Sequence, residues 1–144
     1  QPLTPRLDGT LESALRKTHA LRVAEIINAG IQPLQNLSTI MSVKVAVDAS
    51  GAEVNGKGFA AAKIVRGLTA CEEIVQSCEG RYAVGSTPTI ADVCIVPQLY
   101  AARRFDVDLL KFPRLLEIEA RCAELPSFQA AHASAHPDAV VPKD

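Results

Sequence analysis

The chain has 144 residues, enough for one domain with a buried core. Hydrophobic residues make up 48% of it, aromatic residues 4%, and Trp is absent, a composition that favours close-packed helices over a β-sandwich. The net charge of −1 is spread along the chain, which excludes the basic surface that nucleic acid or an anionic membrane attracts. We therefore predict an all-α domain that binds neither nucleic acid nor membrane.

Neither a membrane span nor a secretory signal peptide is visible in the sequence. The apolar run Val93–Val96 ends at Pro97, far short of the roughly 20 residues that cross a bilayer. We expect a soluble, cytoplasmic protein. Its four cysteines form no CxxC pair, and we interpret them as core thiols: Cys71, Cys78, Cys94 and Cys122.

The first helix is predicted from Thr10 to about Met41, because apolar residues recur there at intervals of three and four. Pro33 lies inside this segment, where it lacks an N–H and crowds the carbonyl of Ala29, so we expect a kink. The apolar face consists of Leu21, Ala24, Ile27, Ile31, Leu34, Leu37 and Met41.

A second face of the same helix is polar but uncharged. Because amides offer a donor and an acceptor together, this stripe has two interpretations. It is either a ladder of amides that serves helix packing or faces solvent, or a wall that hydrogen-bonds a peptide-like ligand or a second domain. The stripe consists of Asn28, Gln32, Gln35, Asn36 and Thr39.

The segment Val43–Gly58 breaks the helical pattern. Its alternating valines resemble a strand, and Gly51–Gly58 approaches a phosphate-binding loop, but Gly58 follows Lys57 where that motif needs a hydroxyl. We therefore predict a mobile or irregular connection and no nucleotide site. The spacing of apolar residues from about Phe59 to Cys78 predicts the next helix.

Helix-start signals organise the second half of the chain. Thr89 and Asp92 have the spacing of a capping box, and the apolar residues that follow predict a helix buried on every side up to Arg103. Pro113 and Pro126 each predict the first turn of a further helix. After His136 we expect an extended tail.

We find no complete catalytic or metal-binding motif. His132 and His136 have the i, i+4 spacing of a metal pair, but no third ligand lies near them in the sequence, so we interpret them as a surface pair and predict no metal.

Two motifs resemble one family. VGSTPTIADVCIVPQ followed by AARRFDVDL is similar to the central helix of the C-terminal domain of glutathione transferases, in the form found in the zeta class, the maleylacetoacetate isomerases. IQPLQNLS, Ile31–Ser38, resembles the signature of that class in the same domain. The ending LPSFQAAHASAHPDA fits as well, so the resemblance extends from Gln1 to about Ala139.

The resemblance implies a domain organisation. Residues 1–9 would be a linker from an N-terminal thioredoxin-like domain that carries a Ser-Ser-Cys motif and is absent from this sequence. Residues 10–136 would form the helical domain and residues 137–144 the tail. No catalytic residue would then lie in this chain, and the chain alone would be inactive.

The resemblance also implies site residues. The residues matching Gln32, Asn36, Leu37 and Ser38 would line the glutathione side of the cleft. Arg104 would hold a carboxylate of a small acidic substrate, while Arg103 would simply be solvated.

The implied reaction is the glutathione-dependent cis–trans isomerisation of maleylacetoacetate to fumarylacetoacetate in tyrosine and phenylalanine breakdown, carried out by a homodimer of the full-length protein. A different interpretation stays open: transferase-like domains also serve as non-catalytic modules for protein–protein assembly.

Overall fold

The computed structural model describes residues 3–50 and 56–139, and over these residues the fold is all-α, as predicted, without a β-strand. None of the helices within this part is long and apolar enough to cross a membrane. The α-helices are α1 (Leu11–Glu25), α2 (Leu37–Ser50), α3 (Gly56–Gln76), α4 (Ile90–Arg104), α5 (Pro113–Ala123) and α6 (Pro126–Ala131). Shorter helical segments are η1 (Ile26–Ile31), η2 (Gln32–Leu34), η3 (Leu109–Lys111) and η4 (Ala133–Ala135).

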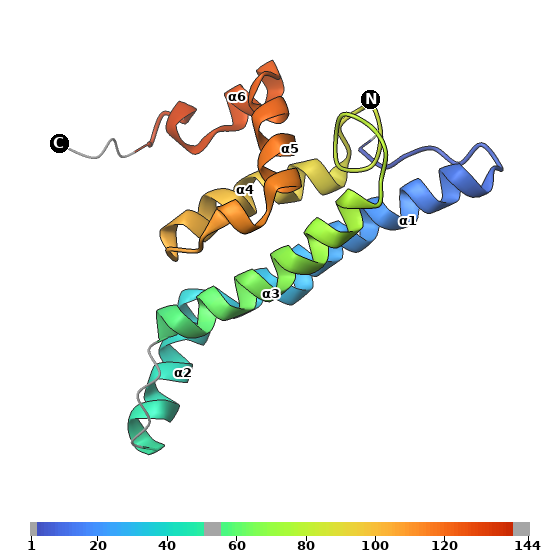
Figure 1. The fold of residues 1–144 in the computed structure, drawn as a ribbon. Coiled ribbons are helices and arrows are strands. Elements are labelled where there is room, and N and C mark those ends of the chain that lie inside the picture. Colours follow the sequence, from blue (N-terminus) through green and yellow to red (C-terminus); the bar gives the residue numbers. More distant parts are fainter. Residues whose placement is uncertain (1–2, 51–55, 140–144) are drawn as a thin grey trace.

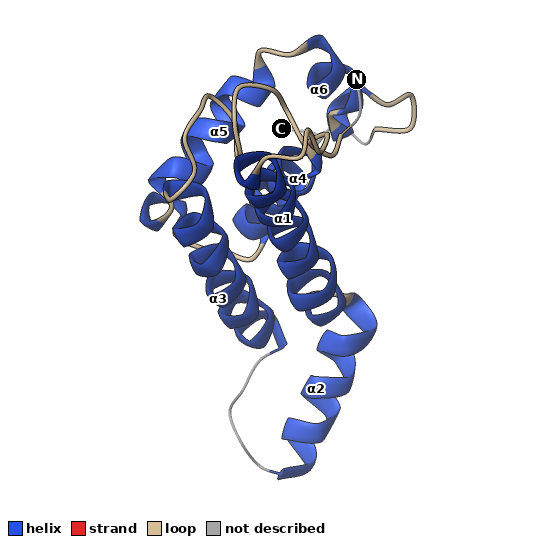
Figure 2. Ribbon diagram, turned by 90° about the vertical axis from the view of Figure 1, so that its right-hand side faces the viewer, coloured by secondary structure: helices blue, strands red, loops and turns tan. Residues whose placement is uncertain are grey.

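The helices α1 and α3 lie side by side along the molecule, and α4 and α5 pack against them (Figure 1). Helix α2 projects beyond the others and contacts α3 and η2, as the second view shows (Figure 2). One continuous core joins α1, η1, α3, α4 and α5. Its largest fully buried apolar side chains are Ile27, Ile31, Ile64, Leu68, Ile95, Leu99, Leu115 and Ile118.

The long first helix is broken between Glu25 and Leu37. In the π-helical segment η1, the chain widens so that the N–H of Gln32 bonds to the carbonyl of Ile27, five residues back. The 3₁₀ segment η2 follows and contains Pro33, which cannot donate a backbone hydrogen bond. The predicted kink is therefore confirmed, but it spans several residues because two changes of helix type accommodate the proline.

The break also rotates the apolar face away from its predicted direction. Ala24, Ile27 and Ile31 are buried, whereas Leu37 is 72% exposed and Met41 53% exposed. The prediction of a single apolar face is therefore wrong after the break, because each non-α turn shifts the angular position of every later side chain. It is also wrong at its first residue, because Leu21 is 45% exposed.

Gly67 allows α3 to pack closely against η1, in the broken part of the first helix. A Cβ atom at Gly67 would lie 2.4 Å from Cδ1 of Ile31, nearer than real Cβ atoms approach other atoms. Ile31 itself is fully buried. The missing side chain therefore lets α3 approach η1 closely, and this contact positions the next residue, Gln32, beside the core.

The prediction of an irregular connection over Val43–Gly58 is wrong for most of its described residues. Helix α2 continues to Ser50, and α3 already begins at Gly56. Residues 51–55 lie outside the described part. No Gly or Pro occurs between Leu37 and Ser50, and β-branched residues disfavour a helix by only about 0.5 kcal/mol each, so the alternating valines do not prevent helix formation.

Helix α4 begins with the capping box. The Asp92 carboxylate accepts hydrogen bonds from the Thr89 N–H at 2.8 Å, the Thr89 hydroxyl at 3.0 Å and the Ala83 N–H at 2.9 Å. Asp92 is 0% exposed and Thr89 4%, so the polar start of α4 is buried together with the loop before it. Helices α5 and α6 begin at Pro113 and Pro126, as predicted.

Two other predictions need correction. Helix α4 is not buried on every side, because Val93 is 37% exposed and Tyr100 48% exposed. The segment after His136 begins with a turn, closed by a hydrogen bond from the Ala139 N–H to the His136 carbonyl, and is not extended there. The rest of the predicted tail, residues 140–144, lies outside the described part.

Candidate functional site

An amide cluster joins the helix break to α4. The Gln32 side chain donates from Nε2 to Oε1 of Gln98 at 2.9 Å. Gln98 in turn donates from Nε2 to Oε1 of Gln35 at 3.0 Å, and Gln35 Nε2 lies 3.4 Å from Gln98 Oε1. Gln98 is 0% exposed, so these two residues supply the hydrogen bonds that its buried amide requires.

Gln98 was not among the site residues predicted from the sequence. It occupies the apolar face of α4, three residues after Ile95 and four after Cys94, both of which are buried. A glutamine at a core position requires polar partners, so its presence on the apolar face of α4 could have indicated a buried polar cluster. The sequence did not show which residues those partners are, because they lie 63 and 66 positions earlier in the chain.

The rest of the polar stripe serves mainly the fold. Thr39 donates from its hydroxyl to the carbonyl of Pro33 at 2.8 Å, and Asn28 Nδ2 lies 3.7 Å from Sγ of Cys94. Asn36 accepts from the Ser38 N–H at 3.1 Å through Oδ1 and thereby caps the first turn of α2. Of the two interpretations left open by the sequence, helix packing applies to Asn28, Gln35 and Thr39.

The residues predicted for glutathione lie in η2 and at the start of α2, and all of them are exposed: Gln32, Asn36, Leu37 and Ser38. The Oε1 atom of Gln32 and the Nδ2 atom of Asn36 have no hydrogen-bond partner among the described residues. One acceptor and one donor are thus left facing outward, which is the set that pairs with the N–H and C=O groups of a peptide.

The two arginines at the end of α4 have different surroundings. Arg103 forms a bidentate ion pair with Glu119 of α5, at 2.7 and 2.6 Å, and these hydrogen bonds raise the pKa of Arg103. The expectation that Arg103 is simply solvated is therefore wrong. Arg104 is exposed, and within the described part of the chain no hydrogen bond or ion pair engages its guanidinium. It shares the exposed face of α4 with Tyr100, four residues earlier.

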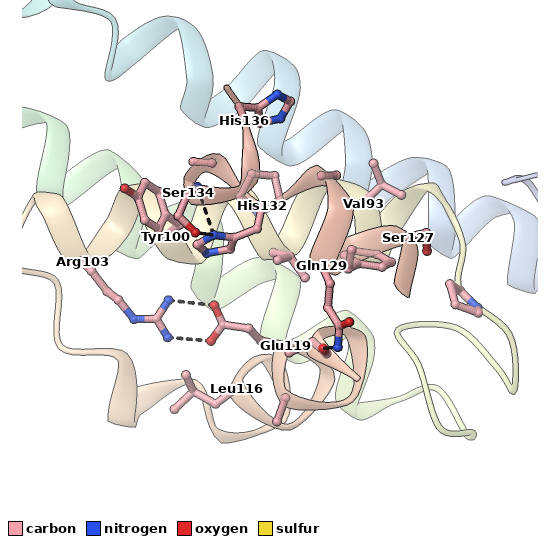
Figure 3. Close-up of a pocket in the computed structure, with 18 of the residues that line it drawn as sticks. Val93, Tyr100, Arg103, Leu116, Glu119, Ser127, Gln129, His132, Ser134 and His136 are labelled. Atoms are coloured by element: carbon pink, nitrogen blue, oxygen red, sulfur yellow. Dashed lines mark hydrogen bonds and ion pairs between the residues drawn. The ribbon is translucent and has the colours of Figure 1, made fainter. Parts of the chain in front are cut away.

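A large groove lies on the other side of α4 from the amide cluster. Its volume is about 1140 Å³, and it is bounded by α4, α5, α6 and the segment after α6 (Figure 3). Tyr100 and His132 meet edge to face with ring centroids 6.1 Å apart. Apart from the histidines, the charged side chains that line the groove are Arg103 and Glu119, which neutralise each other. The groove therefore offers no net positive charge to a dicarboxylate.

The described residues form neither an evident metal-binding site nor a reactive cysteine. No group of three or more His, Cys, Asp and Glu side chains among them is arranged to hold a metal ion, and His132 and His136 are both exposed. The cysteines are free, and burial raises the pKa of Cys71 and of Cys122 to about 12. Cys71, Cys94 and Cys122 are buried, as predicted for core thiols, while Cys78 is half-buried.

Comparison with known proteins identifies the family. Residues 37–134 match the family model described as "Glutathione S-transferase, C-terminal domain". The chain belongs to this family. It is 39% identical over 123 residues to a probable maleylacetoacetate isomerase of Drosophila melanogaster, a match that covers 85% of the chain and 51% of the fly protein. The chain thus spans about half of that relative's length.

Solved structures agree with this assignment. Maleylacetoacetate isomerase from Anaeromyxobacter dehalogenans superposes with a TM-score of 0.82 at 37% identity, covering 97% of the chain and 61% of the bacterial protein. Maleylpyruvate isomerase from Pseudomonas aeruginosa gives 0.79 at 32% identity, covering 96% of the chain and 69% of that protein. The Anaeromyxobacter enzyme has also been solved with glutathione, and with dicarboxyethyl glutathione and citrate, in its active site.

Proposed function

We propose that the chain is the C-terminal domain of a glutathione-dependent maleylacetoacetate isomerase with zeta-class glutathione transferase activity. The observation that carries this proposal is the match, over 97% of the chain, to an isomerase solved with glutathione in its active site. A preceding thioredoxin-like domain would complete the enzyme, with residues 10–136 as the helical domain. The full-length protein would act in the cytoplasm, in tyrosine and phenylalanine catabolism.

The free polar groups in η2 and at the start of α2 fit glutathione, which is a tripeptide. The acceptor of Gln32 and the donor of Asn36 suit a peptide backbone, the Ser38 hydroxyl adds a further polar contact, and the exposed Leu37 side chain offers an apolar one. When bound, glutathione supplies the thiolate that adds to the substrate's double bond and leaves after rotation. In this chain, the residues would hold the tripeptide without activating its thiol.

Arg104 would bind a carboxylate of the acidic substrate. A guanidinium forks two donors onto one carboxylate, which restrains the substrate while its double bond rotates. The support is that Arg104, unlike Arg103, has no acidic partner among the described residues. An arginine already paired with a carboxylate would have to break that pair before binding substrate.

A homodimer of the full-length protein is part of the same proposal. Besides Leu37 and Met41, helix α2 exposes Val45 to 66%, and the three lie four residues apart on one face of the projecting helix. Sedimentation of the full-length protein tests this point, with a dimer as the expected outcome.

The proposal is tested by joining this chain to the part of the Anaeromyxobacter isomerase that lies outside the match. We expect the joined protein to isomerise maleylacetoacetate only when glutathione is present. The isolated chain should neither isomerise maleylacetoacetate nor bind glutathione tightly, because it supplies only one side of the binding pocket. Low-micromolar glutathione binding by the isolated chain, measured by calorimetry, contradicts the second expectation.

Two outcomes of the joined protein are informative. Glutathione binding without isomerisation indicates a different transferase reaction. A folded joined protein that does not bind glutathione overturns the proposal and favours the non-catalytic assembly module.

A further inference from the structure

Gln98 is the most buried amide that the proposed function leaves without a role. It is 0% exposed and lies between Ile95 and Leu99 in the core face of α4. Burying an amide costs free energy unless its groups are hydrogen-bonded. The described partners of Gln98 both come from the helix break, Gln32 at 2.9 Å and Gln35 at 3.0 Å. The buried residue is thus linked directly to the wall proposed to bind glutathione.

The geometry of the break brings these partners together. Gln32 opens the 3₁₀ segment and Gln35 directly follows it. Residues three apart eclipse each other along a 3₁₀ helix, so both amides extend from the same side towards one point on α4. In an α-helix, residues three apart also lie on one face but are turned about 60° from each other, so the 3₁₀ segment aligns the two amides more closely. The helix break at Pro33 therefore not only bends the chain but also directs both amides towards Gln98.

The cluster fixes which atom of Gln32 faces outward. Its Nε2 group donates inward to Gln98 Oε1, so its Oε1 atom is turned to the exposed side. The described residues provide no donor to that oxygen. Such an atom is a hydrogen-bond acceptor only, and it pairs with an N–H group but repels a carboxylate.

We propose that Gln98 is a positioning residue that holds the Gln32 side chain with its nitrogen inward, so that Gln32 Oε1 accepts a peptide N–H of glutathione. This inference rests on the proposed function. It adds the direction of the hydrogen bond and the residue that sets this direction. Without Gln98, the Gln32 amide would rotate freely. Binding glutathione would then require ordering the Gln32 side chain, and this entropy cost would lower the affinity for glutathione.

The first measurement uses this chain by itself and does not depend on the function. In the parent, hydrogen exchange of the Gln32 side-chain amide should be slowed by the bond to Gln98, as followed by NMR. Gln98→Met, which has the same length but no polar atom, should remove this protection. Gln129→Met is the matched control, because Gln129 donates to the Ala123 carbonyl at 2.8 Å, far from the break. An unprotected Gln32 amide in the parent overturns the proposal.

The second measurement uses the joined protein described above. Gln98→Met should raise KM for glutathione about fivefold to tenfold, the range expected for one net hydrogen bond, and leave kcat nearly unchanged. Among variants that stay folded, Gln98→Glu should raise KM less than Gln98→Met does, since its carboxylate still accepts from Gln32, although a buried charge lowers the free energy of unfolding. Equal increases in both variants would indicate a purely structural role and overturn the proposal, as would an unchanged KM in Gln98→Met.

The third measurement covers the case in which Gln98→Met does not fold. Glutathione analogues in which one peptide N–H is replaced by an ester oxygen are compared on the parent and on Gln32→Ala. One ester should weaken binding to the parent about fivefold to tenfold and have no further effect on Gln32→Ala. Additive losses overturn the proposal. If the joined parent binds no glutathione at all, the proposed function fails, while the exchange measurement on the isolated chain still reports on the cluster.

Discussion

The two faces of α4 carry similar residues but have different surroundings. On one face, Ile95, Gln98 and Leu99 are completely buried against α1, η1 and α5. On the other, Val93 is 37% exposed and Tyr100 48% exposed beside the large groove. Valine and isoleucine hardly differ in hydropathy, so the difference lies in what each face meets. Burial along α4 therefore depends on which elements each face contacts, and the amide of Gln98 is buried where Gln32 and Gln35 form hydrogen bonds with it.

The largest effect should come from the buried start of α4. Asp92→Ala leaves the N–H groups of Ala83 and Thr89 without their acceptor, each at about 1–3 kcal/mol, so we expect a loss of roughly 3–5 kcal/mol in the free energy of unfolding. Urea denaturation measures it. Asp108→Ala is the control, because Asp108 also caps a helical turn but is exposed, and it should lose about 1 kcal/mol or less. Equal losses would contradict the importance of burial.

The next prediction compares one residue from each face of α4. Leu99→Ala creates a cavity in the core and should lower the free energy of unfolding by about 2–5 kcal/mol. Tyr100→Ala, one residue further along and half-exposed, should cost less than about 1.5 kcal/mol. Urea denaturation of both variants tests the pair. If Tyr100→Ala lowers the free energy of unfolding as much as Leu99→Ala does, the groove face contributes to the core as much as the buried face.

A smaller effect concerns turnover and uses the joined protein. Arg104→Ala should lower kcat/KM for maleylacetoacetate about tenfold to a hundredfold, because a hydrogen bond to a charged group contributes roughly 1.5–3 kcal/mol. Glutathione binding should change little. Arg104→Lys should not restore the rate, since an ammonium lacks the fork of a guanidinium.

The neighbouring arginine provides the control for this experiment. Arg103→Ala removes a positive charge at the same end of α4 but leaves Arg104 in place, so turnover should stay near that of the parent. If Arg104→Lys is as active as the parent, or if Arg103→Ala is the slower variant, the assignment of the carboxylate to Arg104 is wrong.

The smallest effect lies at the rim of the groove. The Arg103 and Glu119 side chains are 48% and 20% exposed, so solvent screens their ion pair, and we expect a coupling free energy of about 0.5–1 kcal/mol. A double-mutant cycle with Arg103→Ala and Glu119→Ala measures it. The coupling should weaken in high salt. A coupling well above this range would show that the groove face is more strongly shielded from solvent than its exposure indicates.

Much of the fold could be predicted from the sequence where the signal is local. The helix starts at Pro113 and Pro126 and the reciprocal capping of Thr89 and Asp92 depend on residues within one turn of each other. The kink at Pro33 follows from the missing N–H of a single residue. The family motif Ile31–Ser38 likewise identified the segment at which the exposed amides gather.

The all-α class, the order of the helices and the family could therefore be predicted from local sequence patterns. Three long-range contacts became visible only in the folded protein. Gln98 is buried against Gln32 and Gln35, and Arg103 pairs with Glu119. The Glu72 carboxylate caps α5 by accepting from the N–H groups of Arg114 and Leu115 at 2.9 and 3.0 Å. These contacts could not be predicted because their partners lie far apart along the chain. Local backbone preferences act over three or four residues, whereas these polar side chains find partners 16 to 66 residues away, once the packing of the apolar core has brought their helices together.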